Sequence, residues 1–291
     1  MIIKDTFFSK KYTINCRGNL IDLSEPKIMG ILNITPDSFY DGGRYNDDTG
    51  VKKQLKKLIR EGADFIDVGS YSSRPGAEHI SVEEEEKRLY PVLEMIRKQY
   101  PDVYISVDTF RHAIAKKAVE NYQVDMINDI SAGEMDDKMF DTIAELNVPY
   151  VIMHMKGTPQ NMKEKCQYDD LMNEVIYYFS DKYDRLKKKG VNDILIDPGF
   201  GFAKNIKQNF TLLKNLDQFK IFELPVLAGL SRKSMIYKSL GITPDEALPG
   251  TIGLNMLALE KGVNILRVHD VREARENIKL FQFYKQAGGN N

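Results

Sequence analysis

The chain has 291 residues, 42% of them hydrophobic, and its 41 lysine and arginine residues nearly balance 42 aspartate and glutamate residues. This length and composition predict one large α/β domain or two smaller ones, and the small net charge gives no support for a nucleic-acid or acidic-membrane partner. The two cysteines, Cys16 and Cys166, lie far apart without a CxxC motif, so neither a disulfide framework nor a zinc cluster is expected.

Residues 1–25 are expected to form an extension that precedes the main fold. The N-terminal sequence MIIKDTFFSKKY lacks the long apolar core of a signal peptide, and no apolar run approaches transmembrane length. A reduced cytoplasm is therefore the expected location. Two stretches of alternating residues, 11–16 and 20–23, flank the sequence Arg17-Gly18-Asn19, which predicts a small β-hairpin.

The main fold begins with a short apolar run at residues 28–32, which ends at the polar residue Asn33. A continuous apolar run bounded by turn residues predicts a strand that is buried on both faces. The residues that follow contain Pro36 and the pair Gly42-Gly43, so they predict a turn and a flexible loop. Next in the chain we expect a helix over 49–62, a buried strand over 65–69, a polar loop over 70–77 and a helix from residue 81 with Val82, Leu89, Val92, Leu93 and Ile96 as its inner stripe.

The same alternation continues to the end of the chain. Further strands are predicted over 103–109, 126–131, 148–153, 194–196, 226–230 and 264–268, with helices from 111, over about 169–189, over 235–240, over 244–261 and after 270. Eight such units predict a (β/α)8 TIM barrel with an N-terminal β-hairpin, in a single domain over 1–291 whose tail at 286–291 is frayed. A doubly wound open sheet is the competing architecture.

Polar residues at the predicted strand ends favour the barrel, because barrel active sites are built from many strand ends at one face. They are Asn33, Asp67, Asp108, Asn128, His154, Asp197, Lys233 and Arg267 with His269. Each alone has a structural explanation, such as a helix cap for Asp108, a turn for Asp197 or a hydrogen-bonded core position for His154. Together, two carboxylates, an amide, a lysine and an arginine at one mouth would be costly to desolvate without a ligand.

This mixture of side chains fits a flat heterocycle joined to an anion. Carboxylates accept hydrogen bonds from exocyclic amines and ring N–H groups, and an asparagine amide offers a donor and an acceptor. Arg267 and His269, with Asn33 and the loop Ser72-Ser73-Arg74, form a donor-rich cluster that fits a phosphate or pyrophosphate. Neither GxGxxG nor GxxxxGK[ST] occurs, so the anion is expected to belong to a substrate.

Eight motifs in chain order resemble those of the dihydropteroate synthase family and span residues 28–270. They are Asn33-Ile34-Thr35-Pro36-Asp37-Ser38-Phe39 with Asp41-Gly42-Gly43, Asp67-Val68-Gly69 with Ser72-Ser73-Arg74-Pro75-Gly76-Ala77, Ser106-Val107-Asp108-Thr109, Ile127-Asn128-Asp129, Met153-His154-Met155, Asp197-Pro198-Gly199-Phe200-Gly201-Phe202, Ser231-Arg232-Lys233-Ser234 and Arg267-Val268-His269-Asp270. Tyr71 departs from the family, in which many members have glutamate at that position.

The resemblance implies a transferase of folate biosynthesis that joins p-aminobenzoate to 6-hydroxymethyl-7,8-dihydropterin diphosphate and releases pyrophosphate. It also implies Mg²⁺ as cofactor with Asn33 as a metal ligand, and a homodimer. By similarity, the catalytic residues are Asp108, Asp197, Lys233, Arg267 and Asp41, and the pterin is bound by Asp108, Asn128, Met153, Asp197 and Lys233. The diphosphate is expected at Asn33, Ser73, Arg74, Arg267 and His269, and p-aminobenzoate at Phe39, Pro75, Phe202 and Ser234, with Lys233 also near it.

The residue types fit a dissociative mechanism in which loss of pyrophosphate leaves a cationic pterin methylene. Asp108 and Asp197 would stabilise that charge, and Mg²⁺ with Arg267 would offset the charge that grows on the leaving group. Three other functions remain open: a methyltetrahydrofolate:corrinoid methyltransferase, a phosphosugar isomerase or aldolase, and a non-catalytic pterin-binding paralogue. The methyltransferase would not need the diphosphate cluster, and the phosphosugar enzyme would not need two carboxylates that face a flat ring.

Overall fold

The computed structural model describes residues 12–34, 50–72 and 79–287. Its eight parallel strands follow one another in the order β8-β7-β6-β5-β4-β3-β10-β9. The strands are β3 (Lys27–Asn33), β4 (Phe65–Gly69), β5 (Tyr104–Asp108), β6 (Met126–Asp129), β7 (Tyr150–Met153), β8 (Ile194–Asp197), β9 (Leu227–Ala228) and β10 (Ile265–Val268).

The two ends of this strand order meet, which gives a nearly closed barrel. Ile196 of β8 forms a parallel bridge with Val226, just before β9, and its N–H donates to the Pro225 carbonyl at 2.9 Å. The (β/α)8 barrel is therefore confirmed, and the doubly wound open sheet is excluded. β9 is much shorter than the predicted strand over 226–230, because the chain leaves the sheet after Ala228 and turns toward Arg232, whose φ is 55°.

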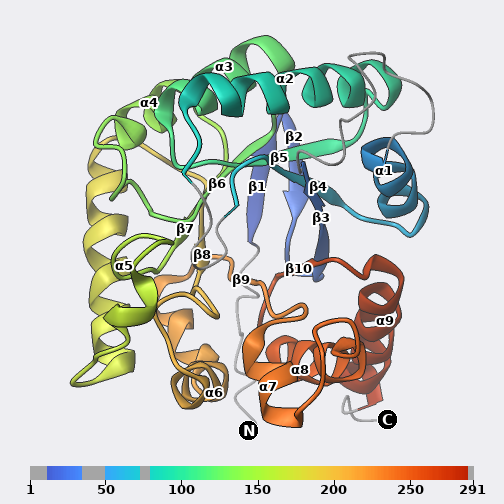
Figure 1. Cartoon of the computed structure of the whole chain (residues 1–291), viewed down its shortest axis with the longest axis vertical. Helices are drawn as coiled ribbons and strands as arrows, with labels where there is room; N and C mark the ends of the chain where they lie inside the picture. Colours follow the sequence, from blue (N-terminus) through green and yellow to red (C-terminus); the bar gives the residue numbers. More distant parts are fainter. Residues whose placement is uncertain (1–11, 35–49, 73–78, 288–291) are drawn as a thin grey trace, which may run out of the picture.

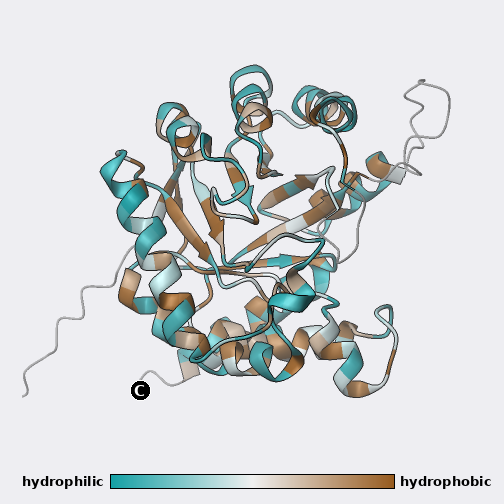
Figure 2. Ribbon diagram, turned by 60° about the vertical axis from the view of Figure 1, so that its left-hand side comes forward, coloured by the Kyte–Doolittle hydropathy of each residue, from teal (hydrophilic) through white to brown (hydrophobic). Residues whose placement is uncertain are grey.

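Helices surround the barrel, as Figure 1 shows with α2 to α4 across the top, α5 at the left, α6 to α8 along the bottom and α9 at the lower right. Figure 2 shows hydrophobic colours concentrated on the strands and on the inner faces of helices. The helices are α1 (Gly50–Arg60), α2 (Val82–Gln99), α3 (His112–Tyr122), α4 (Met139–Leu146), α5 (Leu171–Lys188), α6 (Ile206–Lys214), α7 (Ser234–Leu240), α8 (Leu248–Glu260) and α9 (Val271–Ala287), with short 3-10 helices η2 (Met162–Lys165) and η3 (Leu216–Phe222).

The core of α2 matches the predicted inner stripe except at its first position. Leu89, Val92, Leu93 and Ile96 are buried, whereas Val82 is 36% exposed, since it lies in the first turn at the helix end. At the other end of the chain, α9 continues to Ala287, and the rest of the predicted tail, residues 288–291, lies outside the described residues. None of the described helices is both long and apolar enough to cross a membrane.

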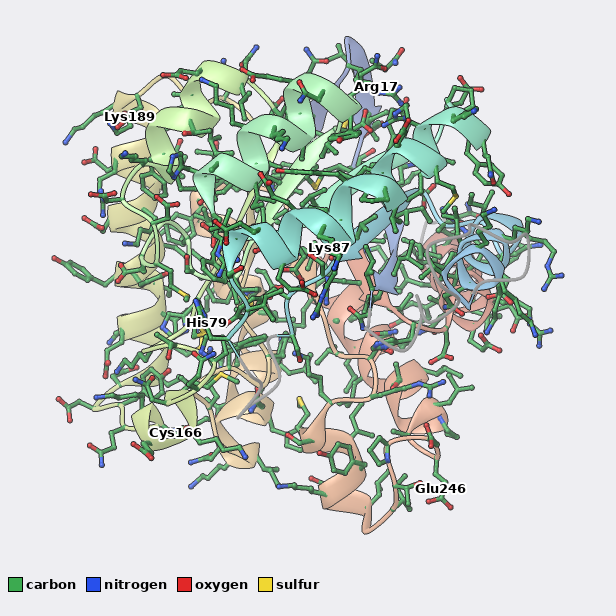
Figure 3. All side chains as sticks on the ribbon, turned by 45° about the horizontal axis from the view of Figure 1, so that its top comes forward. Arg17, His79, Lys87, Cys166, Lys189 and Glu246 are labelled. Carbon is green, nitrogen blue, oxygen red and sulfur yellow. The ribbon has the colours of Figure 1, made fainter. Side chains whose placement is uncertain are left out.

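The predicted hairpin is confirmed as β1 (Thr13–Cys16) paired antiparallel with β2 (Asn19–Asp22). Ile14, Cys16 and Leu23 pack in one apolar cluster with strand residues such as Met29 and Phe65. Met29 and Phe65 lie near the N-terminal ends of their strands, so the hairpin closes that end of the barrel. In Figure 3, Arg17 of the hairpin turn lies at one end of the molecule and Glu246, between α7 and α8, at the opposite end. The other mouth of the barrel is therefore left for the site.

Candidate active site

A cavity lies at the C-terminal ends of the barrel strands, where the sequence predicts the site. It is lined by Asp108, Asn128, Ile130, Met153, Asp197, Phe200, Phe202, Gly229, Lys233 and Arg267. Seven of these ten were predicted as site residues: Asp108, Asn128, Met153, Asp197, Phe202, Lys233 and Arg267. Parallel strands of a barrel deliver their last side chains to the same face, which is why residues up to 159 positions apart meet here.

The Arg267 guanidinium joins two of these strand ends. Its Nε donates to Asp67 Oδ2 at 2.6 Å and its Nη2 donates to Asp108 Oδ2 at 2.8 Å. Asn128 Nδ2 also donates to Asp67 Oδ2, at 3.1 Å. Burial acts to lower the pKa of Arg267, but the two carboxylates outweigh that effect and raise it. Arg267 is thus a permanent cation whose charge is shared by two aspartates.

Asp67 is the buried carboxylate that binds both Arg267 and Asn128, a role that the sequence did not reveal. Its side chain is fully buried, and its second oxygen, Oδ1, has no hydrogen-bond partner in the part of the chain that the structure describes. A buried carboxylate without a neighbouring cation would be costly, so Arg267 stabilises Asp67 as much as it serves the cavity. The available signal was the position of Asp67 within a strand, two residues before its end.

The two carboxylates that line the cavity have different supports. Burial raises the pKa of Asp108, and the ion pair with Arg267 opposes this rise and favours the carboxylate. Burial also raises the pKa of Asp197, opposed by the Gly199 N–H, which donates to Asp197 Oδ1 at 2.8 Å, and by the charge of Lys233. Both groups therefore lie in a poorly solvated position where a cationic ligand would be strongly favoured.

Lys233 reaches the cavity from the connection between β9 and α7. The preceding residue, Arg232, has a φ of 55°, and both Asp270 oxygens accept hydrogen bonds from its guanidinium, at 2.7 and 3.1 Å. This anchor directs Lys233 inward, where its Nζ lies 4.5 Å from the centre of the Phe202 ring. Burial lowers the pKa of Lys233 to about 8, so the ammonium form predominates at neutral pH.

The other predicted residues lie beside the cavity or outside the described residues. Asn33 is exposed at the end of β3, and Ser234 is the first residue of α7. His269 Nδ1 lies 3.0 Å from Ser231 Oγ, and burial with the nearby Arg267 charge lowers its pKa to about 4, which keeps its ring neutral. The residues that lie outside the described part of the chain are Phe39, Asp41, Ser73, Arg74 and Pro75.

Tyr71, the departure in the second loop, has a clear structural role. Its hydroxyl lies 3.1 Å from His79 Nδ1 and accepts a hydrogen bond from Gln160 Nε2 at 2.9 Å. Its ring packs edge-on against Phe110, with centroids 5.0 Å apart, in a cluster that also contains Met153 of the cavity wall. Tyr71 thus connects the loop that follows β4 to Gln160, in the loop that follows β7, and to Phe110, after β5.

Comparisons with known proteins identify the relatives of this chain. Residues 29–269 match the family described as pterin binding enzyme. A dihydropteroate synthase of Escherichia coli K12 is 41% identical over 268 residues, 91% of this chain and 94% of that protein. The dihydropteroate synthase of Bacillus subtilis is 39% identical over 264 residues and covers 90% of each chain.

Solved structures show the same relationship. The Yersinia pestis dihydropteroate synthase in complex with a sulfonamide drug has a TM-score of 0.87 at 38% identity, and the match covers 94% of this chain and 99% of that one. The Xanthomonas albilineans dihydropteroate synthase with 4-aminobenzoic acid has a TM-score of 0.86 at 36% identity, covering 94% and 98%. The chain therefore belongs to the pterin-binding enzymes and is a member of the dihydropteroate synthase family.

Proposed function

We propose that this chain condenses 6-hydroxymethyl-7,8-dihydropterin diphosphate with p-aminobenzoate, giving 7,8-dihydropteroate and pyrophosphate. One observation carries the proposal: two carboxylates, an amide and an ammonium line one cavity at the C-terminal face of the barrel. The relatives at about 40% identity are dihydropteroate synthases over nearly their whole length. We infer the identity of the substrates from that relationship and the mechanism from the residues of the cavity.

The pterin ring fits the polar residues that converge in the cavity. Asp108 and Asp197 would accept hydrogen bonds from the exocyclic amine and ring N–H groups, and Asn128 offers both a donor and an acceptor. Lys233 would donate to a ring nitrogen or carbonyl, and Met153 would pack against the ring face. Four of these residues are the last or nearly the last of their strands, and Lys233 is positioned by the ion pair between Arg232 and Asp270. The site is therefore held in place before the substrate binds.

A dissociative reaction needs cation stabilisation more than a nucleophilic side chain. When the bond to the diphosphate breaks, positive charge develops on the pterin methylene, and Asp108 and Asp197 lie in the poorly solvated cavity that would hold it. The arylamine of p-aminobenzoate then attacks the cation and loses its proton. Phe202 and Ser234 border the space where the arylamine would approach. Neither of the free cysteines is required, and both lie away from the cavity lining.

The diphosphate is proposed to lie toward Arg267, His269 and Asn33. Among the described residues, the Arg267 guanidinium donates through Nε and Nη2, and its Nη1 would donate to the diphosphate. We also propose Mg²⁺ as cofactor, because the exposed amide oxygen of Asn33 fits an ion held mainly by water and substrate phosphates. No cluster of three or more His, Cys, Asp or Glu side chains suited to a metal occurs in the described residues, so a resident protein cage does not compete with that arrangement. When bound, Mg²⁺ would neutralise charge on the leaving group.

The test is pyrophosphate release with the pterin diphosphate, Mg²⁺ and p-aminobenzoate, each omitted in turn. Release that requires all three, together with formation of dihydropteroate, is the expected result. Pterin binding without release, under conditions in which a known synthase turns over, would favour a non-catalytic paralogue. Methyl transfer from methyltetrahydrofolate to a corrinoid would instead support the methyltransferase, which has no use for a diphosphate site.

The reaction is expected to lose activity at alkaline pH through Lys233. Burial lowers the pKa of its ammonium to about 8, so the group is charged below that pH and neutral above it. We expect kcat/KM for the pterin diphosphate to fall as the pH rises through about 8. In Lys233→Arg this alkaline decrease in kcat/KM should shift to higher pH, because a guanidinium stays charged throughout this range. A pH profile with the same alkaline limb in both proteins would show that another group is responsible.

We further propose a homodimer formed through the last helices. In α9, Ile278 and Phe281 are buried in the core, whereas Leu280, Phe283 and Tyr284 are more than 60% exposed. Leu257 of the neighbouring α8 is also exposed, and neighbouring apolar side chains on an outer face are typical of an interface. The cytoplasm is the proposed compartment, which the buried free thiol of Cys16 supports.

Phe283→Glu is expected to convert the dimer to a monomer, because it would place a charge in the centre of this apolar face. The measurement is the molar mass from sedimentation equilibrium. Tyr177→Glu is the control, since Tyr177 is an exposed aromatic residue on α5, 77% exposed against 61% for Phe283. A wild-type chain that sediments as a monomer would contradict the proposal, and so would a dimer that survives the change at Phe283.

A further inference from the structure

Lys204 is a buried cation that the sequence analysis did not single out and the proposed reaction does not use. Only 7% of the residue is exposed. Its Nζ donates to the Gly199 carbonyl at 3.0 Å and to the Phe202 carbonyl at 3.1 Å, and it lies 2.8 Å from His154 Nδ1. The His154 carbonyl lies farther away, at 3.5 Å. An ammonium has three protons, and the three shorter contacts can use all of them. Burial lowers the pKa of Lys204 to about 7, but the acceptor set fits the charged form.

His154 takes part in this arrangement as an acceptor. An ammonium can only donate, so His154 Nδ1 accepts, and the ring proton of the neutral form is assigned to Nε2. Burial first, and then the charge of Lys204, lower the pKa of His154 well below its usual value. The ring is enclosed by aromatic side chains, with the Tyr178 centroid 4.9 Å away. His154, which closes the β7 strand end, is therefore a fixed contact for Lys204 and not a proton carrier.

The loop 198–203, which Lys204 binds, is tightly constrained by its neighbours. Gly199 has a φ of 74°, and a side chain there would clash with the His154 carbonyl oxygen. Farther along, the Gly201 N–H donates to Asn209 Oδ1 at 2.7 Å, and Asn209 Nδ2 donates to the Lys204 carbonyl at 3.0 Å. At Gly199, the loop packs against the residue that follows β7. At Gly201 it is hydrogen-bonded to α6, and the Lys204 ammonium binds its carbonyls at Gly199 and Phe202.

The same loop supplies part of the cavity wall. Phe200 and Phe202 line the cavity, and a methyl group on Gly201 would lie 3.1 Å from Cδ of Lys233. A displacement of the loop would therefore move the Phe202 ring and disturb Lys233. Asp108 and Asn128, in contrast, are placed by strands β5 and β6, which Lys204 does not touch.

We propose that Lys204 is a positioning residue for the p-aminobenzoate side of the site: its ammonium, bound by two loop carbonyls and by His154, fixes the loop that presents Phe202. The inference rests on the proposed function for its substrate and on the described contacts for its geometry. Without the ammonium, the Phe202 carbonyl and the His154 ring nitrogen lose their donor, and the Gly199 carbonyl keeps only the Phe202 N–H, at 3.2 Å. The loop must then shift to satisfy these buried acceptors.

Lys204→Met removes the charge and keeps most of the side-chain volume. We expect KM for p-aminobenzoate to rise about tenfold or more, since small displacements of positioning groups have large kinetic effects. KM for the pterin diphosphate should change less than about threefold, because strands hold most of its contacts. Lys182→Met is the control: Lys182 is also buried, but it pairs with Glu134 and, among the described residues, forms no hydrogen bond or ion pair with the loop 198–203. Equal changes in both substrates' KM values, or the same rise in the control, would overturn the proposal.

A second variant and a measurement without turnover keep the test decisive. In Lys204→Ala, methylammonium should fit the vacated space and lower KM for p-aminobenzoate, whereas tetramethylammonium at the same ionic strength should not. Amide hydrogen exchange over residues 198–203 should accelerate in Lys204→Met and not in Lys182→Met. If the wild-type chain released no pyrophosphate, the proposed reaction would fail, and the exchange result alone would decide whether Lys204 fixes the loop. Unchanged exchange would overturn the inference, as would rescue by both ions.

Discussion

Arg267→Met is expected to lower the free energy of unfolding by about 3–5 kcal/mol, the usual cost of removing one partner from a buried ion pair. The change leaves Asp67 fully buried and Asp108 mostly buried without the guanidinium that binds both, at 2.6 and 2.8 Å. Methionine fills much of the same space, so the loss should come from unpaired charge and not from a cavity. Urea unfolding followed by circular dichroism would measure it.

Two comparisons separate charge pairing from other effects of the Arg267 change. Asp67→Asn added to Arg267→Met should recover part of the lost stability, because it removes one of the two orphaned charges. Arg275→Met should cost less than about 1 kcal/mol, since the ion pair of Arg275 with Asp64 lies on the outside of the barrel. Equal losses in Arg267→Met and Arg275→Met, or no recovery in the double variant, would contradict this account.

The sequence predicted the barrel and most of the cavity because both follow from local pattern. A short apolar run followed by a polar residue indicates a buried strand and its end, and a closed parallel sheet brings all such ends to one face. That reasoning placed Asp108, Asn128, Asp197 and Lys233 together without any knowledge of distances. It also explains the smaller errors: the length of β9 depends on where the chain turns toward Arg232, which apolar pattern alone does not specify.

The roles that the sequence did not reveal depend on partners far along the chain. Asp67 gains its role from Arg267, 200 positions away, and Lys204 from His154, 50 positions away. Neither pairing leaves a mark in the local sequence, since a lysine after a glycine-rich turn is usually solvated. Likewise, the stripe in α9 divides into core and surface only once α8 is placed beside it. Such roles depend on tertiary packing and need the structure.

Asp108→Asn is expected to lower kcat/KM by about 10²- to 10³-fold, the range seen when one preorganised electrostatic contact is removed from an active site. The reason is chemical: an amide of nearly the same shape cannot offer a negative charge to the developing cation, and its NH₂ group would face the donors of the pterin edge. Stability should fall less than in Arg267→Met, because Arg267 keeps its ion pair with Asp67. Steady-state kinetics and urea unfolding of the same preparation would test both statements.

Asp125→Asn provides the opposite case at the other end of the barrel. Asp125 is fully buried, pairs with Arg17 and Arg97, and accepts the Ile105 N–H at 2.8 Å, far from the cavity. We expect this variant to lose stability while the folded fraction keeps its kcat/KM. Asp125, at the hairpin end of the barrel, would then contribute to stability, and Asp108, at the C-terminal strand ends, to catalysis. Full activity in Asp108→Asn would remove the carboxylate from the mechanism, and Asp197 would have to stabilise the cation without it.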